Sequence, residues 1–112
     1  MRATLAEIED LLHRYGQDYQ ASVVAATRHA WADDRPLALQ RLTSPEWWET
    51  PDSVAAVDLA IAGGFSPQAR ADHDRFLRAL IDVYEQMTRA GAINPRAELV
   101  VAEFRKWLAS GM

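Results

Sequence analysis

The sequence contains no cysteine, so thiol chemistry plays no part in what the protein does. A disulfide framework, a thiolate nucleophile and a zinc site built on sulfur are all excluded. Long hydrophobic runs are missing too, and none approaches the about 20 apolar residues that a bilayer-spanning helix needs. The first residues carry acids where a signal peptide has bases. We therefore expect a cytoplasmic protein with no membrane partner.

Excess positive charge is also absent, since the 112 residues carry a formal net charge of −4. Residues 1–56 contain five arginines against nine acidic residues, whereas residues 57–112 balance seven basic against seven acidic residues. Nucleic-acid binding needs a basic stripe that neutralises phosphates, so we expect no nucleic-acid partner. The charge fits a basic protein partner, but it is also what keeps a small domain in solution.

Signals that start helices recur along the chain. A capping side chain stands directly before a proline at Ser44, Thr50, Ser66 and Asn94. The side-chain oxygen of such a residue accepts an otherwise unpaired N–H, and proline loses nothing at the first helical position. No run of alternating β-branched residues predicts a strand. With 49% hydrophobic and 25% charged residues, the chain has the composition of one globular domain over residues 1–112.

Apolar residues recur at three- and four-residue spacing along most of the chain, which predicts a compact all-α bundle without a β-sheet. Thr4 and Glu7 match a capping box at the start of the first helix, and Asp34 is placed to cap the third. Residues 53–62 are apolar on every side except at Asp58, so this helix is expected to thread the centre of the bundle. The five to six helices are expected at residues 4–15, 18–32, 35–42, 53–62, 67–90 and 95–110.

Residues 43–53 are the one long stretch in which we expect no more than a single helical turn. They include the adjacent Trp47 and Trp48, which either plug the open end of the bundle or form an exposed anchor for a partner. At least one indole is expected to be a plug, because soluble proteins rarely expose two together. Since loops often carry function, we predict that a partner binds here, with Glu49 and Asp52 completing the surface.

Asp58 and His73 are polar residues that fall on apolar faces of predicted helices. We expect both to be buried and to have hydrogen-bond partners, because an unpaired polar group in the core is costly. The alternative is that His73 acts as a general base oriented by a carboxylate, either that of Asp58 or that of Asp74. Because His73 falls on the apolar stripe of its helix, we favour the buried, hydrogen-bonded histidine over the general base.

No arrangement of residues demands a particular catalytic chemistry. The chain has no Gly-x-Ser-x-Gly nucleophile elbow, and its Gly63-Gly64 pair lacks the lysine of a phosphate-binding loop. Glu9 and His13 are spaced to share a metal ion, but no third ligand accompanies them. We therefore predict no cofactor and no metal, and we favour a protein without enzymatic activity.

Four short segments carry a resemblance to a known family. They are LLHRYG at residues 11–16, SPEWW at residues 44–48, DSV at residues 52–54 and DL at residues 58–59. Together they resemble a family of small uncharacterised bacterial helical domains with a "GGMGS" or tryptophan-containing turn before an Asp-Leu helix. The likeness covers about residues 5–90 and departs from the family where Glu-Thr-Pro replaces glycines at residues 49–51. It implies a helical fold and a distinctive segment at residues 47–58, but no activity.

From these observations we expect a single-domain module that binds another protein, or a second copy of itself, through the loop of Trp47 and Trp48. One alternative is an immunity or antitoxin protein that neutralises a basic toxin. Another is a small hydrolytic or ligand-binding enzyme that uses His73 with Asp58 or Asp74.

Overall fold

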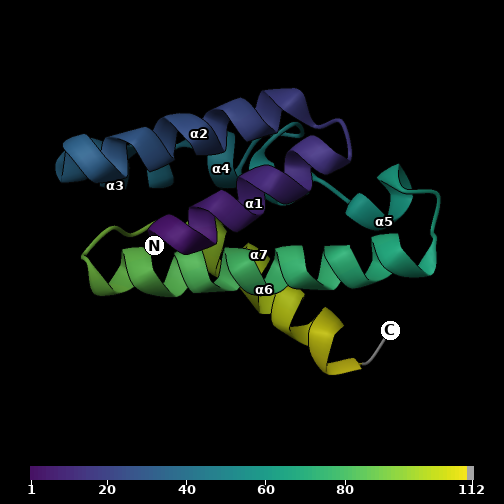
Figure 1. Cartoon of the computed structure of the whole chain (residues 1–112). Helices are drawn as coiled ribbons and strands as arrows, with labels where there is room; N and C mark the ends of the chain where they lie inside the picture. Colours follow the sequence, from purple (N-terminus) through teal and green to yellow (C-terminus); the bar gives the residue numbers. More distant parts are fainter. Residues whose placement is uncertain (111–112) are drawn as a thin grey trace.

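The fold is all helical, as the sequence predicts. The computed structural model describes residues 1–110, and over these residues it contains helices and no strand. Figure 1 shows them as α1 (Arg2–Arg14), α2 (Asp18–Asp33), α3 (Arg35–Leu42), α4 (Pro45–Trp48), α5 (Leu59–Ala62), α6 (Pro67–Arg89) and α7 (Pro95–Ser110). A 3₁₀ turn, η1 (Val54–Ala56), lies between α4 and α5. Five of the six predicted helices are present with ends within two residues of the prediction.

Helix α1 is the centre of the bundle. It lies between α2 and α6 and packs against both (Figure 1). Its side chains at Leu5, Ile8 and Leu12 have no exposed surface. Burial of each such side chain stabilises the fold by about 1.5–3 kcal/mol. The prediction that residues 53–62 thread the centre is therefore wrong.

Residues 53–62 are not one helix, because the chain extends at Val57 and Asp58 between η1 and α5. The Asp58 Oδ1 atom accepts the backbone N–H of Ile61 at 3.1 Å and so caps α5. A short aspartate side chain favours this cap over a helix interior, where it competes with the backbone for hydrogen bonds. Asp58 is thus a half-exposed cap, with 44% of its side chain accessible, and not a buried polar group as predicted.

Other predicted caps are present in part. The side-chain oxygens of Asp34, Ser66 and Asn94 accept backbone N–H groups at the starts of α3, α6 and α7 respectively. The capping box at Thr4 is wrong, because α1 already begins at Arg2 and the Thr4 hydroxyl instead donates to Asp82 on α6 at 2.6 Å. Thr50 begins no helix, because the chain makes a turn after it.

Helix α7 crosses α6, and its last turns project beyond the rest of the bundle (Figure 1). Only Ala97 and Val101 of this helix are buried, and the Trp107 side chain is 45% exposed. The apolar stripe predicted for residues 95–110 is thus covered at its start and partly open at its end. Among residues 1–110, no helix combines the length and the apolar character needed to cross a bilayer.

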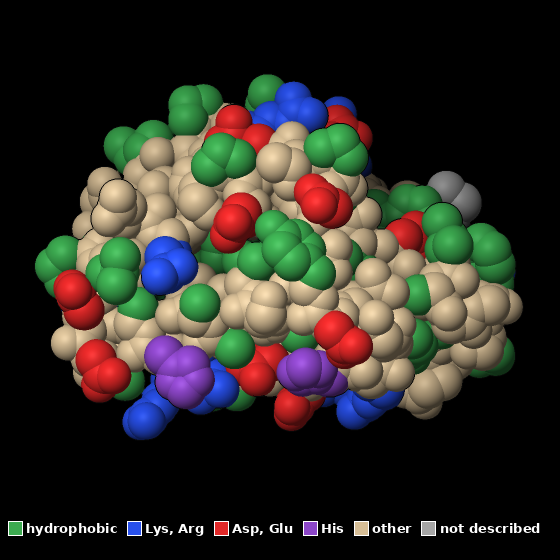
Figure 2. Space-filling view, turned by 90° about the horizontal axis from the view of Figure 1, so that it is seen from above, with side chains coloured by type: hydrophobic (Ala, Val, Ile, Leu, Met, Phe, Trp, Pro, Cys, Tyr) green, Lys and Arg blue, Asp and Glu red, His purple; other side chains and the backbone are tan. Residues whose placement is uncertain are grey.

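The face seen from above in Figure 2 carries scattered acidic side chains. Asp and Glu side chains are spread over it, and Lys and Arg form no continuous band there. This distribution agrees with the acidic excess of residues 1–56, which supply the helices on that side of α6.

Substitution of Asp58 tests whether this residue is a cap. Asp58→Ala is expected to lower the free energy of unfolding by about 0.5–2 kcal/mol, because the Ile61 N–H loses its acceptor. Asp58→Asn keeps an acceptor and is expected to cost little, which chemical denaturation of both variants will measure. If Asp58→Ala stabilises the protein, as alanine does inside a helix, the break at Asp58 is contradicted.

Candidate functional site

The tryptophan pair belongs to the core. Trp47 is fully buried and Trp48 is 2% exposed. The Trp47 indole N–H donates to the Thr27 hydroxyl at 3.0 Å, and that of Trp48 donates to the Leu42 carbonyl at 2.7 Å. Each ring therefore has its polar atom satisfied inside the protein. Both indoles are plugs, as expected for at least one of them, and neither is the exposed anchor of the alternative.

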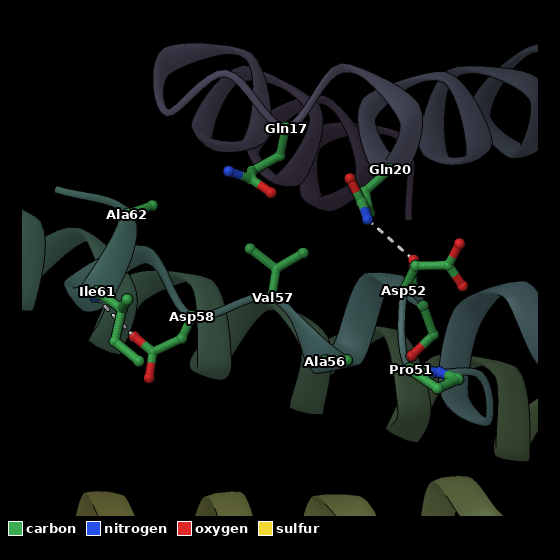
Figure 3. Close-up of a pocket in the computed structure, with 10 residues that line it drawn as sticks. Gln17, Gln20, Pro51, Asp52, Ala56, Val57, Asp58, Ile61 and Ala62 are labelled. Carbon is green, nitrogen blue, oxygen red and sulfur yellow. Dashed lines mark hydrogen bonds between the residues drawn. The ribbon is translucent and has the colours of Figure 1, made fainter.

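Glu49 and Asp52 are exposed at the end of the same loop. A Glu49 carboxylate oxygen accepts an amide N–H of Asn94 at 3.3 Å, and the Asp52 carbonyl accepts one from Gln20 at 2.9 Å (Figure 3). These contacts attach the loop to the starts of α7 and α2. With both indoles buried, the predicted binding surface presents no exposed aromatic ring beside the two acids.

A shallow groove of about 430 Å³ separates the start of α2 from residues 51–62. In Figure 3 the Val57 side chain points toward Gln17 and Gln20, whereas the Asp58 carboxylate points away from them. The groove is open to solvent, and no group of charged side chains converges on its floor. Its geometry supports no particular chemistry.

A second pocket, of about 390 Å³, combines aromatic and charged side chains. An adjoining pocket of about 260 Å³ shares Asp58, His73 and Trp107 with it. We call the two together the His73 pocket. They lie where α5, the first turns of α6 and the last turns of α7 meet. The remaining lining residues are Ala60, Phe65, Arg70, Asp74, Leu77, Glu103 and Phe104.

Phe65 and Trp107 are exposed aromatic residues of this pocket. Their exposed fractions are 57% and 45%. Phe65 has a φ of +60°, the only positive φ of a residue other than glycine within residues 1–110. This backbone conformation costs an L-residue about 1–2 kcal/mol. In this conformation the Phe65 N–H donates to the Ala60 carbonyl at 2.7 Å and closes the turn that ends α5, which leaves the ring at the surface.

His73 is 9% exposed and has one ring nitrogen engaged. Its Nδ1 atom accepts the backbone N–H of Leu59 at 3.3 Å, so the neutral ring carries its proton on Nε2. Nε2 has no protein partner among residues 1–110, and every fully buried side-chain nitrogen or oxygen there has one. The Nε2–H group must therefore reach solvent, and it is available to donate to a ligand.

Carboxylates outnumber cations around the pocket. Asp58, Asp74 and Glu103 line it, against Arg70 alone. Asp74 has no hydrogen bond or ion pair within residues 1–110, and the helical pair with Arg78 that its spacing suggests is not formed. Asp74 therefore offers the pocket a negative charge that no side chain within residues 1–110 pairs with.

Among residues 1–110, the pocket lacks the contacts of a histidine-centred catalytic site. The Nδ1 atom of His73 lies 4.0 Å from Asp58 Oδ1, too far for the hydrogen bond that would orient a general base. No serine or threonine hydroxyl lines the pocket to act as a nucleophile. Within the described residues, no three His, Asp or Glu side chains lie close enough together to hold a metal ion.

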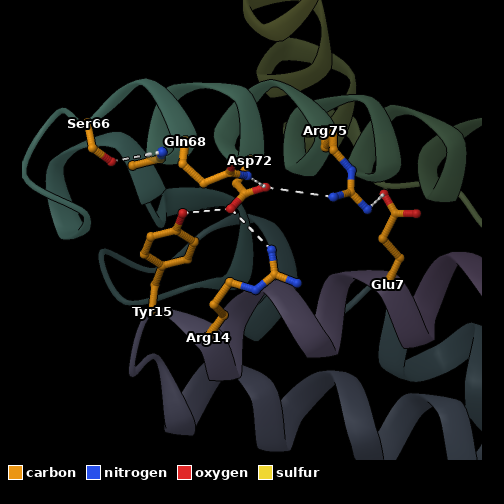
Figure 4. Close-up of polar contacts among 8 residues, drawn as sticks. Glu7, Arg14, Tyr15, Ser66, Gln68, Asp72 and Arg75 are labelled. Atoms are coloured by element: carbon orange, nitrogen blue, oxygen red, sulfur yellow. Dashed lines mark hydrogen bonds and ion pairs between the residues drawn. The ribbon is translucent and has the colours of Figure 1, made fainter.

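Asp72 precedes His73 on α6 and is completely buried. Figure 4 shows its carboxylate between α6 and the end of α1. Its Oδ2 atom accepts the Tyr15 hydroxyl at 2.6 Å and the Arg14 guanidinium at 3.2 Å, and its Oδ1 atom accepts the Gln68 amide at 3.0 Å. Arg75 lies 3.7 Å from Oδ1. These contacts fix the part of α6 that carries the pocket.

The hydrogen bond from Tyr15 shifts the pKa of both partners. It is the main cause that lowers the pKa of Asp72, with Gln68 and Arg14 adding to it against the opposing effect of burial. The same bond, with burial and the negative charge of Asp72, raises the pKa of Tyr15. The role of Asp72 was not predicted from the sequence. Its position in the helix could have indicated burial, because Asp72 lies three residues after Ala69 and four before Phe76, on the same buried face of α6.

Comparison with known proteins adds no relative. No family model matches the chain, and neither a curated protein nor a solved structure matches it significantly. The function must therefore be argued from the geometry of this chain.

Removal of the Tyr15 hydroxyl tests the contact with Asp72. Tyr15→Phe is expected to lower the free energy of unfolding by about 1–3 kcal/mol, because a buried carboxylate loses its shortest hydrogen bond. Tyr19→Phe is the matched control, since the Tyr19 ring is 48% exposed and its hydroxyl makes no hydrogen bond within residues 1–110. If urea denaturation shows the same loss of unfolding free energy in both variants, the hydrogen bond from Tyr15 to Asp72 does not stabilise the fold as stated.

The pH dependence of stability tests the charge of Asp72. Its pKa in the folded chain lies below the ordinary value of 3.8, so the folded state binds this proton less tightly than the unfolded state. Asp72 therefore stabilises the fold above pH 3.8, and this contribution is lost as the pH falls below that value. Asp72→Asn should remove this part of the acid destabilisation. If the unfolding free energy of Asp72→Asn depends on pH in the same way as that of the wild type, Asp72 does not make this contribution.

The burial of the tryptophan pair predicts a contrast with Trp107. Trp47→Ala is expected to lower the free energy of unfolding by about 3–5 kcal/mol, because it leaves a large cavity in the core. Trp107→Ala removes a half-exposed ring and should cost about 1 kcal/mol or less. Denaturation followed by far-ultraviolet circular dichroism measures both. A stable, fully helical Trp47→Ala variant would show that this indole is not a core plug.

Proposed function

We propose that the protein is a non-catalytic binding module of the cytoplasm that recognises a basic segment of another protein at the His73 pocket. One observation carries the proposal: the pocket joins two exposed aromatic rings to an excess of carboxylates, one of which, Asp74, has no partner within residues 1–110. The proposal keeps the predicted role in protein binding and moves the binding surface away from the tryptophan loop.

The aromatic side chains support a protein partner. Tryptophan and other aromatic residues are enriched at interfaces, because they bury much apolar area at a small loss of conformational entropy. Phe65 and Trp107 line the same concave surface, and the pocket volume lies in the range of known ligand sites. A partner that covers these side chains removes them from water.

Charge favours a basic partner. The carboxylates of the pocket and the net charge of −4 attract a cationic segment and repel an acidic one. The same repulsion acts between two copies of this acidic chain, which makes self-association the weaker hypothesis. An immunity or antitoxin protein that neutralises a basic toxin is one specific form of the proposed function.

An enzymatic role for His73 has less support. Its Nδ1 atom accepts a backbone N–H, and in the neutral ring Nε2 already carries the proton, so neither nitrogen is free to act as a base. The Asp58 carboxylate caps α5 instead of orienting the imidazole.

Selection from a random peptide library tests the proposed function. The wild-type protein is expected to enrich peptides rich in arginine and lysine. The double variant Phe65→Ala, Trp107→Ala should bind the selected peptides at least about tenfold more weakly, because two aromatic anchors are lost. Leu99→Ala is the matched control, since Leu99 is 64% exposed on α7 outside the pocket.

Two results would contradict the proposal. One is enrichment of neutral or acidic peptides, and the other is equal binding by the wild type and the double variant. Light scattering of the same samples measures whether the protein associates with itself. A dimer that forms at micromolar concentration and is lost in the double variant would replace the basic partner with a second copy of the chain.

A further inference from the structure

The two parts of the His73 pocket differ in charge. Arg70 lines only the larger part, where its guanidinium carbon lies 6.0 Å from the centre of the Phe65 ring. The smaller part is lined by Asp58 and Glu103 together with Trp107, and by no cation. Trp107 lines both parts, and Asp74 lines only the larger one. A positive group stacked on Trp107 therefore lies where the two parts join, with Asp74 on the side of the larger part and Asp58 and Glu103 on the side of the smaller part.

The three carboxylates of the pocket differ in how many hydrogen bonds and ion pairs they already make with other groups of the protein. Asp74 makes no hydrogen bond or ion pair within residues 1–110. Asp58 uses Oδ1 to cap α5, and Glu103 is 3.4 Å from Lys106 in a pair whose side chains are both largely exposed. Exposed pairs of this kind contribute little and exchange readily. Asp74 is thus the carboxylate with most to gain from a ligand.

We infer that the pocket binds a single arginine side chain of the partner, with the guanidinium stacked on Trp107 and paired with Asp74. This inference rests on the proposed function and identifies the group that the site recognises. Guanidinium is planar, stacks on aromatic rings and pairs with a carboxylate through two parallel N–H groups, which an ammonium group cannot do. The chain already contains this type of stacking, since the Arg35 guanidinium lies 3.8 Å from the centre of the Trp31 ring.

His73 completes the recognition of an arginine residue within a peptide. Its Nε2–H donates and cannot contact the cation itself, so it requires an acceptor on the ligand. The backbone carbonyl of the bound arginine or of its neighbour provides one. The pocket therefore has a carboxylate for the side chain, a donor for the backbone and an aromatic ring for the guanidinium plane.

Titration with N-acetyl-arginine amide, followed by two-dimensional ¹H–¹⁵N spectra, tests this inference. The indole N–H signal of Trp107, identified with a Trp107→Phe variant, is expected to shift and saturate. The buried N–H groups of Trp47 and Trp48 should not move, so they report whether the fold is intact. N-acetyl-citrulline amide has nearly the same shape without the charge and should bind at least about tenfold more weakly.

Two further comparisons define the anchor. N-acetyl-lysine amide should bind more weakly than the arginine probe, because it cannot make the stacked, two-fold contact. Asp74→Asn should weaken binding of the arginine probe at least about fivefold, as expected for loss of a charge-assisted hydrogen bond. Glu98→Gln, the same change of charge at an exposed position of α7 outside the pocket, should leave binding unchanged.

The results that would contradict the arginine site can be told apart from those that would contradict the proposed binding function. Equal binding of the arginine and citrulline probes, equal binding of the lysine probe, or an Asp74→Asn variant that binds as the wild type does would overturn the arginine site. If peptides from the library still need Phe65 and Trp107 in that case, the binding function stands without this anchor. If the arginine probe binds as expected and no selected peptide depends on the two rings, the arginine site stands and the proposed function fails.

Discussion

The buried carboxylate of Asp72 is the interaction on which the rest of the structure depends. It accepts hydrogen bonds from Tyr15 and Arg14 at the end of α1 and from Gln68 within α6. Helix α1 is the central helix, so this contact sets how the helices around it are placed against α6. A buried carboxylate without partners would be strongly destabilising, which makes the geometry of the contact demanding. The next residues of α6, His73 and Asp74, are positioned by the same contact.

Much of the fold could be predicted because its signals are local. Capping residues before proline and the spacing of apolar side chains fix where α2, α3, α6 and α7 begin and end. The wrong predictions lie where one local sequence pattern is compatible with two different structures. Asp58 among apolar residues suits both the interior of a buried helix and the start of a short one, and the backbone follows the stronger preference of aspartate for a cap. The burial of Trp47 depends on Thr27, which is distant in the sequence.

The candidate site could be predicted only in part, because it depends on how distant segments meet. His73, Asp58 and Asp74 were grouped in the sequence as a possible catalytic set, and they do line one pocket. The exposure of Trp107 could not be predicted, since periodicity shows which face of a helix is apolar but not how much of that face a neighbour covers. The crossing of α6 and α7 leaves the last turns of α7 uncovered. That crossing angle is a tertiary property with no local signal.

The central claim is that the surface around His73, and not the loop of Trp47 and Trp48, recognises a basic partner. Amide hydrogen exchange of the protein with and without an arginine-rich peptide selected from the library tests it most directly. We predict slower exchange in residues 58–74 and 103–108 when the peptide is bound, with no change in residues 44–53. Slower exchange confined to residues 44–53 would contradict the claim.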